Sequence, residues 1–265
     1  MSTRALRTAA TGMYAQQLNI QVISNNIANM NTTSFKKSRA EFKDLIYQEI
    51  AAKPQEEVTP GTVEEAISKV QIGSGVKTSS TQKMFQQGDL QQTGQQLDVA
   101  ISGDGFFQVR RIDGTFAYTR DGSFKISSEG SLVTSDGYLI EPGFTVDEQL
   151  KSLSISRDGV ISAQDVGGEI IELGRVELAK FLNPGGLLAL GDNLYEETEA
   201  SGIPILGQPG QEGFGELNQG YLESSNVDIV EEMISMISAQ RAYEINSKTV
   251  TTVEQMMTTA NNLKR

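Results

Sequence analysis

Paired carboxylates are the residues in this sequence whose type and spacing could support catalysis. Glu56 and Glu57 are adjacent, as are Glu196 and Glu197, and both pairs lie in polar segments where such residues are usually solvated. Two carboxyl groups can hydrolyse a glycosidic bond, one as acid and the other as base or nucleophile. Because the chain contains no His, a glycosidase-type reaction is the only catalysis that these pairs leave conceivable.

The sequence contains no Cys, no His and no Trp. These absences remove every thiol nucleophile, every Ser-His-Asp triad and the usual zinc and haem ligands. A chain without Cys also suits a protein that must work in any redox compartment. We therefore expect no enzyme, no catalytic residue, no cofactor and no metal ion.

Asp followed by Gly recurs in the second third of the chain and could indicate either calcium sites or tight turns. The spacing of an EF-hand loop or of a calcium-binding nonapeptide repeat is missing, so turns are the better interpretation. Flanking runs of alternating apolar residues predict β-hairpins with type I′ turns. The five dipeptides are Asp104-Gly105, Asp113-Gly114, Asp121-Gly122, Asp136-Gly137 and Asp158-Gly159.

Two Gly-rich triplets, Gly73-Ser74-Gly75 and Gly103-Asp104-Gly105, lack the further Gly or the Gly-Lys that phosphate cradles require. These motifs therefore do not predict catalysis, and the remaining signals in the sequence concern secondary structure. From Leu97 onward, short alternating runs predict a mainly antiparallel β region. Later strands are expected at 153–156, 160–163, 169–173 and 175–181, followed by a long loop over 202–215.

The longest predicted element is a helix from Ser225 to Leu263, where apolar residues recur at steps of three and four. Asp228, Glu231 and Glu232 place negative charge at its start, the favoured sign there. Without an internal Gly or Pro, it would be roughly 55 Å long. Its apolar residues occupy more than one side, so other segments or other copies must cover it.

A second helix is expected over residues 2–30, with a diluted apolar seam at Leu6, Met13, Ile20 and Ile27. Gly12 costs about 1 kcal/mol relative to Ala in a helix interior. We therefore expect this segment to be disordered in a free monomer and to fold on assembly.

Between the β region and the first helix, residues 38–50 form a short amphipathic piece and residues 52–70 an exposed acidic loop. Residues 1–45 carry six basic and two acidic side chains, a net charge of +4 in a chain of net charge −12. This small patch without aromatic residues predicts no nucleic-acid site. No membrane span and no cleavable signal peptide are expected.

Motifs at both ends of the chain resemble those of the axial proteins of the bacterial flagellum, the rod and hook family. Residues 9–13 and 24–32 are similar to its N-terminal signature, and residues 239–248 to its C-terminal one. One departure is Ser34, where the family usually has Gly before the Phe-Lys pair, and a left-handed turn there would be costly for Ser. Further blocks are similar to the distal rod members, namely 38–48, 71–76, 105–109, 118–124 and 220–223.

The resemblance implies an α+β fold in which long N- and C-terminal helices pair as a coiled-coil-like inner domain around a central, mainly antiparallel β region. It implies four parts: an N-terminal axial helix in 1–35, a connecting domain in 36–96, an outer β domain in 97–220 and a C-terminal axial helix in 221–265. The segment 46–70 is expected to help lock the shaft straight.

The function implied is a structural subunit of the distal rod that polymerises helically into a rigid hollow drive shaft and transmits motor torque to the hook. Its place is the basal body, from the periplasm to the outer membrane, reached by type III export without a cleaved signal peptide. The implied partners are copies of itself, the proximal rod proteins, the hook protein, the P-ring and L-ring proteins and the rod cap protein. No membrane insertion is implied.

Apolar helix residues are the predicted subunit interface, and an intramolecular core is the alternative interpretation that can hold alongside it. Two other functions stay open: another axial member, such as a proximal rod or hook subunit, and a cell-wall-degrading enzyme. The predicted interface residues are Leu6, Met13, Ile20, Ile27, Val230, Met233, Ile234, Ile237 and Tyr243.

Overall fold

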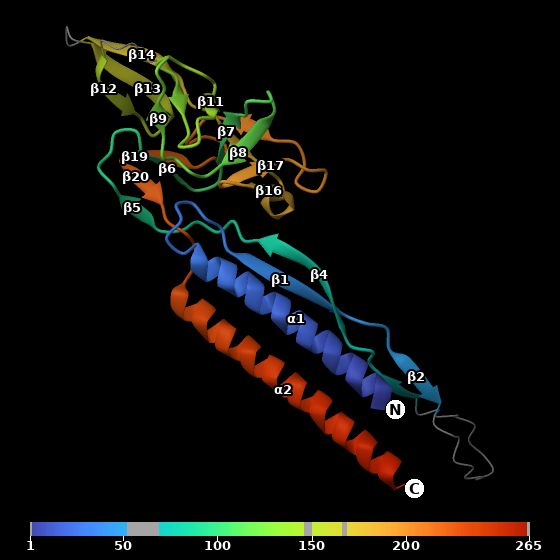
Figure 1. Ribbon diagram of the computed structural model, residues 1–265. Coiled ribbons are helices and arrows are strands. Elements are labelled where there is room, and N and C mark those ends of the chain that lie inside the picture. Colours follow the sequence, from blue (N-terminus) through green and yellow to red (C-terminus); the bar gives the residue numbers. More distant parts are fainter. Residues whose placement is uncertain (1, 52–68, 146–149, 166–168, 264–265) are drawn as a thin grey trace, which may run out of the picture. The chain divides into compact units, whose positions relative to one another are not determined.

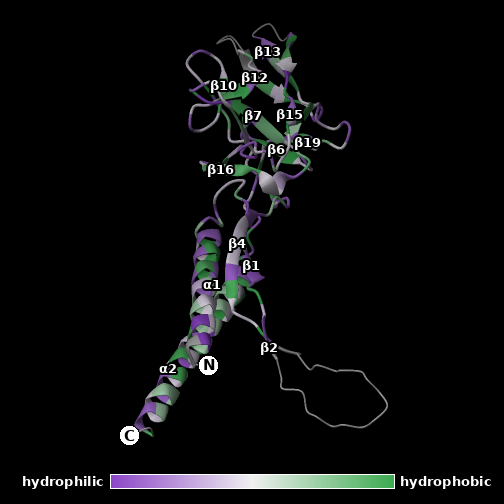
Figure 2. Ribbon diagram, turned by 90° about the vertical axis from the view of Figure 1, so that its right-hand side faces the viewer, coloured by the Kyte–Doolittle hydropathy of each residue, from purple (hydrophilic) through white to green (hydrophobic). Residues whose placement is uncertain are grey.

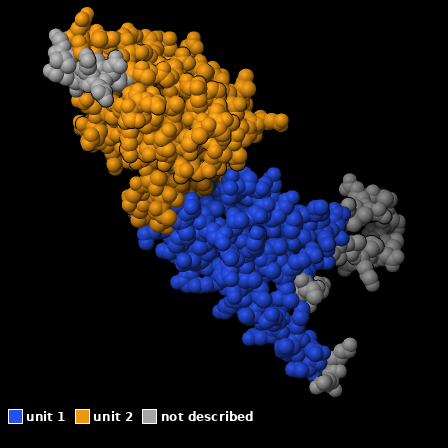
Figure 3. All heavy atoms as spheres, turned by 45° about the horizontal axis from the view of Figure 1, so that its top comes forward, with its two compact units in different colours: residues 1–25, 39–81, 230–265 blue, residues 26–38, 82–229 orange. Residues whose placement is uncertain are grey.

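The computed structural model describes residues 2–51, 69–145, 150–165 and 169–263 of the protein (Figure 1). These residues divide into two compact units, shown in two colours in Figure 3. Unit 1 takes the described residues of 1–25, 39–81 and 230–265, and unit 2 takes those of 26–38 and 82–229. The fold combines two helices with a mainly antiparallel β region, which confirms the α+β class.

The two predicted helices are present as α1, Ser2–Ala28, and α2, Ile229–Asn262. Glu231 and Glu232 lie in the first turn of α2, as expected for the positive end of a helix dipole. In α1 the chain leaves the helix through turns in which the N–H groups of Asn29 and Met30 donate to the carbonyls of Asn26 and Ile27. The helices lie side by side and run in opposite directions (Figures 1 and 2).

The segment after α1 differs from its prediction. In place of one amphipathic piece over 38–50 there are two strands, β1, Ser38–Asp44, and β2, Gln48–Ala51. β1 pairs with β4, Val76–Lys83, and β2 pairs antiparallel with β3, Lys69–Ile72. Residues 52–68, most of the predicted loop at 46–70, lie outside the described residues.

Unit 2 is built around a sheet that holds nine strands among the described residues. β7 is central to it, since it pairs with β8, β11 and β15. β16, β17, β10, β9 and β18 continue the sheet outward. The strands are β7, Phe106–Arg110; β8, Phe116–Thr119; β9, Lys125–Ile126; β10, Leu132–Val133; β11, Leu139–Glu141; β15, Leu178–Lys180; β16, Leu188–Gly191; β17, Leu194–Glu196; and β18, Ile205–Gly207.

Three smaller sheets complete unit 2. The first has three antiparallel strands, in the order β12, β13, β14. The second consists of β19 and β6, and the third of β20 and β5. A 3₁₀ turn, η1, spans Pro184–Gly186. The strand bounds are β5, Leu90–Gln92; β6, Val99–Ser102; β12, Leu150–Ile155; β13, Val160–Asp165; β14, Ile170–Arg175; β19, Glu216–Gln219; and β20, Tyr221–Glu223.

Two hydrophobic clusters flank the central sheet because neighbouring residues of a strand point to opposite faces. Phe107 packs with Phe124 at a ring distance of 5.0 Å, in the cluster that also holds residues of β12 and β13. Phe106 enters the other cluster, where its ring lies 5.7 Å from that of Phe181. The adjacent Phe106 and Phe107 are therefore both buried, because β7 is covered on both faces.

Three of the five Asp-Gly dipeptides form hairpins, at Gly114, Gly137 and Gly159. Their turn type differs from the prediction, because only the Gly has positive φ. In each, the Gly N–H donates to the carbonyl three residues earlier, as in a three-residue loop with a Gly bulge. Gly105 and Gly122 lie between strands that do not pair. A Cβ on Gly122 would lie 1.7 Å from the Val99 carbonyl oxygen, so close backbone approach requires Gly there.

The other strand predictions are confirmed by β12 to β15. The predicted loop over 202–215 is wrong in part, because it contains β18, which pairs antiparallel with β15. A short run such as Ile205–Gly207 has too few alternating positions to be separated from a loop by its pattern alone.

Candidate functional site: the exposed side of the C-terminal helix

One side of α2 is covered within the chain. Ala239 and Val253 are buried, and Met236, Asn246 and Val250 are half-buried. These positions follow one another at steps of three, seven, four and three, so they lie on one face of the helix. Apolar residues recur along the whole of α2 (Figure 2), but this face accounts for only some of them.

The covered side faces α1, and Gly12 allows the close approach. A Cβ placed on Gly12 would lie 3.0 Å from the Asn246 Nδ2, which is tighter than ordinary contact. The same part of α1 meets the β2–β4 region, where a Cβ on Gly75 would lie 2.3 Å from the Thr11 Oγ1. Gly12, a costly residue in a helix considered alone, is therefore explained by packing.

The opposite side of α2 is exposed in the described residues and carries four large apolar side chains, which we call the apolar ridge. Val230 is 62% exposed, Met233 52%, Ile234 60% and Ile237 55%. At 100° per residue, the ridge points roughly 180° away from the covered face. The structure thus leaves four predicted interface residues open to a partner.

The other predicted interface residues are placed differently. Leu6, Met13, Ile20 and Ile27 are half-buried along α1, and Tyr243 is 40% exposed at the edge of the covered face of α2. Because four of these residues belong to α1 and Tyr243 lies on another side of α2, one chain does not bring them together with the ridge.

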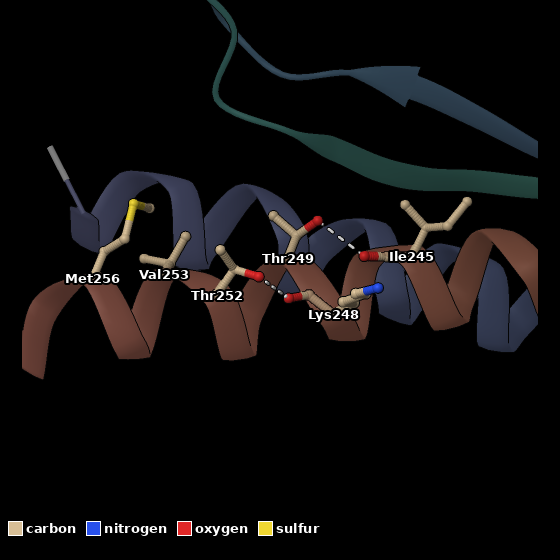
Figure 4. Close-up of a pocket in the computed structure, with 6 residues that line it drawn as sticks. All are labelled: Ile245, Lys248, Thr249, Thr252, Val253 and Met256. Carbon is tan, nitrogen blue, oxygen red and sulfur yellow. Dashed lines mark hydrogen bonds between the residues drawn. The ribbon is translucent and has the colours of Figure 1, made fainter.

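A shallow groove of about 350 Å³, which we call the helix groove, runs along the C-terminal half of α2 (Figure 4). Val253 forms its buried part, and Ile245 and Met256 are exposed on it. The hydroxyls of Thr249 and Thr252 donate to backbone carbonyls of α2 itself, those of Ile245 and Lys248. The lining residues are Ile245, Lys248, Thr249, Thr252, Val253 and Met256.

A buried cluster of charges in unit 2 was not predicted from the sequence. The Lys36 Nζ lies 2.5 Å from Glu223 Oε1, and both side chains are fully buried. Arg120 Nη1 lies 3.5 Å from Glu223 Oε2. Lys36 Nζ also donates to the Gln86 carbonyl over 2.8 Å, and the Gly88 N–H donates to Glu223 Oε1 over 2.9 Å. The cluster therefore connects two segments of unit 2. One follows α1 and contains Lys36, and the other is β20, which precedes α2 and contains Glu223.

Ser34 belongs to the same junction. It adopts the left-handed conformation, with φ of 57°, that makes Gly the usual choice. Its hydroxyl donates to the Arg120 carbonyl over 2.8 Å, and its N–H donates to the Glu223 carbonyl over 2.8 Å. The hydroxyl bond, which Gly could not make, offsets part of the cost of this backbone conformation.

Burial shifts the pKa of several groups in unit 2. Burial lowers the pKa of the Lys36 ammonium, while the neighbouring Glu223 carboxylate acts in the opposite sense. Burial, followed by the nearby Glu197 carboxylate, raises the pKa of the Tyr118 hydroxyl to about 12. Both effects belong to packed ionisable groups, and neither group lines a cavity described above.

Of the two carboxylate pairs considered for catalysis, only Glu196 and Glu197 lie among the described residues. Glu56 and Glu57 lie outside the described residues, and Glu197 accepts a hydrogen bond of 3.4 Å from the Tyr118 hydroxyl. In the described part of the chain no group of three or more His, Cys, Asp or Glu side chains is placed to hold a metal ion. Neither described helix is long and apolar enough to cross a membrane.

Three family models match the chain, and together they define a class of flagellar rod and hook proteins. Residues 6–36 match the model described as flagella basal body rod protein. Residues 100–163 match the D1 domain of the flagellar hook protein FlgE/F/G, and residues 218–263 match the C-terminal part of flagellar basal body rod FlgEFG proteins. The N- and C-terminal matches cover most of α1 and α2.

Curated relatives narrow the class. The chain is 52% identical to the flagellar basal-body rod protein FlgG of Borreliella burgdorferi, with 99% of each chain covered. It is 47% identical to that of Caulobacter vibrioides, over 98% of this chain and 99% of the relative, and 41% identical to that of Bacillus subtilis, with 99% of each covered. The chain belongs to the FlgG family of flagellar basal-body rod proteins. These are structural proteins and not enzymes.

Proposed function

We propose that this protein is a structural subunit of the flagellar distal rod, and that copies of it associate through α1 and α2 into a rigid hollow shaft that carries torque to the hook. Membership of the FlgG family supports the place in the basal body. The observation that carries the mechanism is the apolar ridge, because a single chain covers only the opposite side of α2.

The energetic argument concerns the ridge. Burying a large aliphatic side chain completely contributes about 1.5 to 3 kcal/mol. Val230, Met233, Ile234 and Ile237 are all more than half exposed, so each can still contribute about 1 kcal/mol or more on association. Repeated in every subunit of a polymer, this term favours assembly over the free chain.

The inner domain of the subunit is the proposed pair of α1 and α2. The covered side of α2 is spaced at alternating steps of three and four through Met236, Ala239, Tyr243, Asn246 and Val250, the spacing of a coiled-coil seam. The close approach of Gly12 to Asn246 supports pairing along this seam.

In the complete assembly, we propose four parts of the subunit: axial helices within 1–35 and 221–265, a connecting domain in 36–96 and an outward-facing β domain in 97–220. The partners are further copies, the proximal rod proteins, the hook protein, the rod cap protein and the P-ring and L-ring proteins. The assembled subunits would lie in the periplasm, in the part of the rod that leads toward the outer membrane, after type III export.

The alternatives receive less support. The relatives named FlgG reach 52% identity, whereas FlhP of Bacillus subtilis, a flagellar hook-basal body complex protein, is 30% identical over 98% of the chain. This difference favours the distal rod over another axial position. A wall-degrading enzyme is not favoured, because the family is structural.

The test replaces Ile234 by Asp in cells where the variant is the only copy of this protein. A carboxylate buried in an apolar interface without a partner costs several kcal/mol, so rods should fail to form and motility should be lost. Isolated basal bodies imaged by electron microscopy provide the measurement. Ser235→Asp, on an exposed position of the same turn outside the ridge, is the control and should assemble. Normal rods from Ile234→Asp would contradict the proposal.

A further inference from the structure

The ridge and the helix groove lie on the same helix but at different places. We propose that the apolar ridge at the start of α2 in one copy packs into the helix groove along the C-terminal half of α2 in the next copy. This inference rests on the proposed function and adds the two surfaces that meet.

Both surfaces carry exposed apolar side chains. The groove offers exposed apolar side chains at Ile245 and Met256 beside the buried Val253. The ridge offers Val230, Ile234 and Ile237, which are all more than half exposed. Figure 4 shows the groove residues following one another along α2, so that a neighbouring helix could lie along them.

The proposed contact joins two different surfaces of the chain. Ile234 and Thr252 are 18 residues apart, which is about 27 Å along a helix. The groove is also turned by about 80° around the helix from the ridge. A contact between two different surfaces of identical chains builds a ring if its rotation closes and a helical filament if it does not, and a rod requires the second case.

Charge favours a second copy as the occupant. The first turn of α2 is acidic, with Glu231 exposed beside the ridge. Lys248 lies on the groove. A ridge seated in the groove therefore brings opposite charges to the same contact, and one sequence supplies both surfaces in equal number.

The chain has no Cys, so disulfide cross-linking can test this contact without a background. Ile234→Cys is combined in turn with Thr249→Cys, Thr252→Cys and Met256→Cys. A disulfide requires Cα atoms about 4.4 to 6.8 Å apart. Because the groove positions lie about 22 to 33 Å along the helix from residue 234, no pair can close inside one chain.

Rods isolated from cells that express each variant are oxidised mildly and separated on a non-reducing gel. At least one pair should give a ladder of dimers, trimers and larger species, with several times more cross-linked protein than the control pair Ile234→Cys with Thr251→Cys. Thr251 is exposed but does not line the groove. Each single variant should give no species larger than a dimer.

Other results would overturn the inference. Rods without a ladder for any of the three pairs would leave the proposed function intact but remove this contact. Dimers without larger species would indicate a closed contact. If the Cys variants do not assemble, an exchange of charges tests the contact. Lys248→Glu should reduce the yield of rods, and adding Glu231→Lys in the same chain should restore it. A yield that stays low in the double variant would reject the contact. Absence of rods from the unaltered protein would reject the proposed function itself.

Discussion

At the scale of single residues, Glu223 joins several segments of unit 2. Its two carboxylate oxygens lie near Lys36 and Arg120, and its backbone carbonyl accepts from the Ser34 N–H. Buried ion pairs are weak evidence of net stability, since desolvation opposes their attraction. Removing one partner of a buried pair is strongly destabilising, because the remaining charge is then buried without its counterion.

Glu223→Gln should therefore lower the free energy of unfolding of unit 2 by about 3 to 5 kcal/mol, since the substitution keeps the size of the side chain but leaves Lys36 without a carboxylate. Denaturant unfolding followed by the near-ultraviolet signal of the Tyr residues measures this change. Glu216→Gln, on an exposed residue of β19, should change it by less than about 0.5 kcal/mol. Equal midpoints for the two variants would show that the cluster is not stabilising.

The sequence could reveal little of this cluster. Ser34 was noticeable because it stands where Gly is usual, and its φ of 57° agrees with that signal. Lys36 and Glu223 are 187 positions apart and look like ordinary surface charges in a linear sequence. Only the fold brings them together, so no local pattern could predict their burial.

At the scale of elements, the helices and most hairpins could be predicted because their signals are local. The spacing of apolar residues in α2 and the Asp-Gly turns at Gly114, Gly137 and Gly159 each act within a few residues. The signals fail where tertiary contact decides. Gly122 avoids a clash with Val99 and forms no hairpin, and residues 38–50 become strands through pairing with partners further along the chain.

Gly12 gives a prediction for the helix pair. Leu is the better residue in an isolated helix by somewhat less than about 1 kcal/mol. The added side chain must nevertheless displace Asn246, and overpacking of this kind usually costs about 1 to 3 kcal/mol. Gly12→Leu should therefore speed hydrogen exchange of α1 and α2 amides. Ala10→Leu, at an exposed position of α1, should leave exchange the same or slow it, and the reverse order would contradict the packing role of Gly12.

At the scale of the whole molecule, the protein divides its apolar surface unequally. Unit 2 encloses two cores, whereas the helices of unit 1 cover one side of α2 and leave the ridge exposed. Segments with few buried contacts open more often than packed ones. The expectation that residues 2–30 gain order on assembly has the same basis, namely that the helices of unit 1 bury less apolar surface than unit 2 does.

Dilute protein treated with trypsin should therefore be cut first at Arg4, Arg7, Arg241 and Lys248, leaving a resistant fragment that contains unit 2. Mass spectrometry of the products over time identifies the order of cleavage. In isolated rods the same four sites should be protected at equal protease concentration. Protection of both chain ends in the dilute monomer would contradict the idea that neighbouring copies complete the helical part.

The carboxylate of Glu223 also links two stretches of the chain mechanically. The stretch that departs from α1 and the stretch that approaches α2 are anchored by one side chain, through Lys36 on one and Glu223 itself on the other. A pull on either stretch would therefore reach the other through this one carboxylate. In a rotating polymer, such a link would limit independent movement of the two stretches within each subunit.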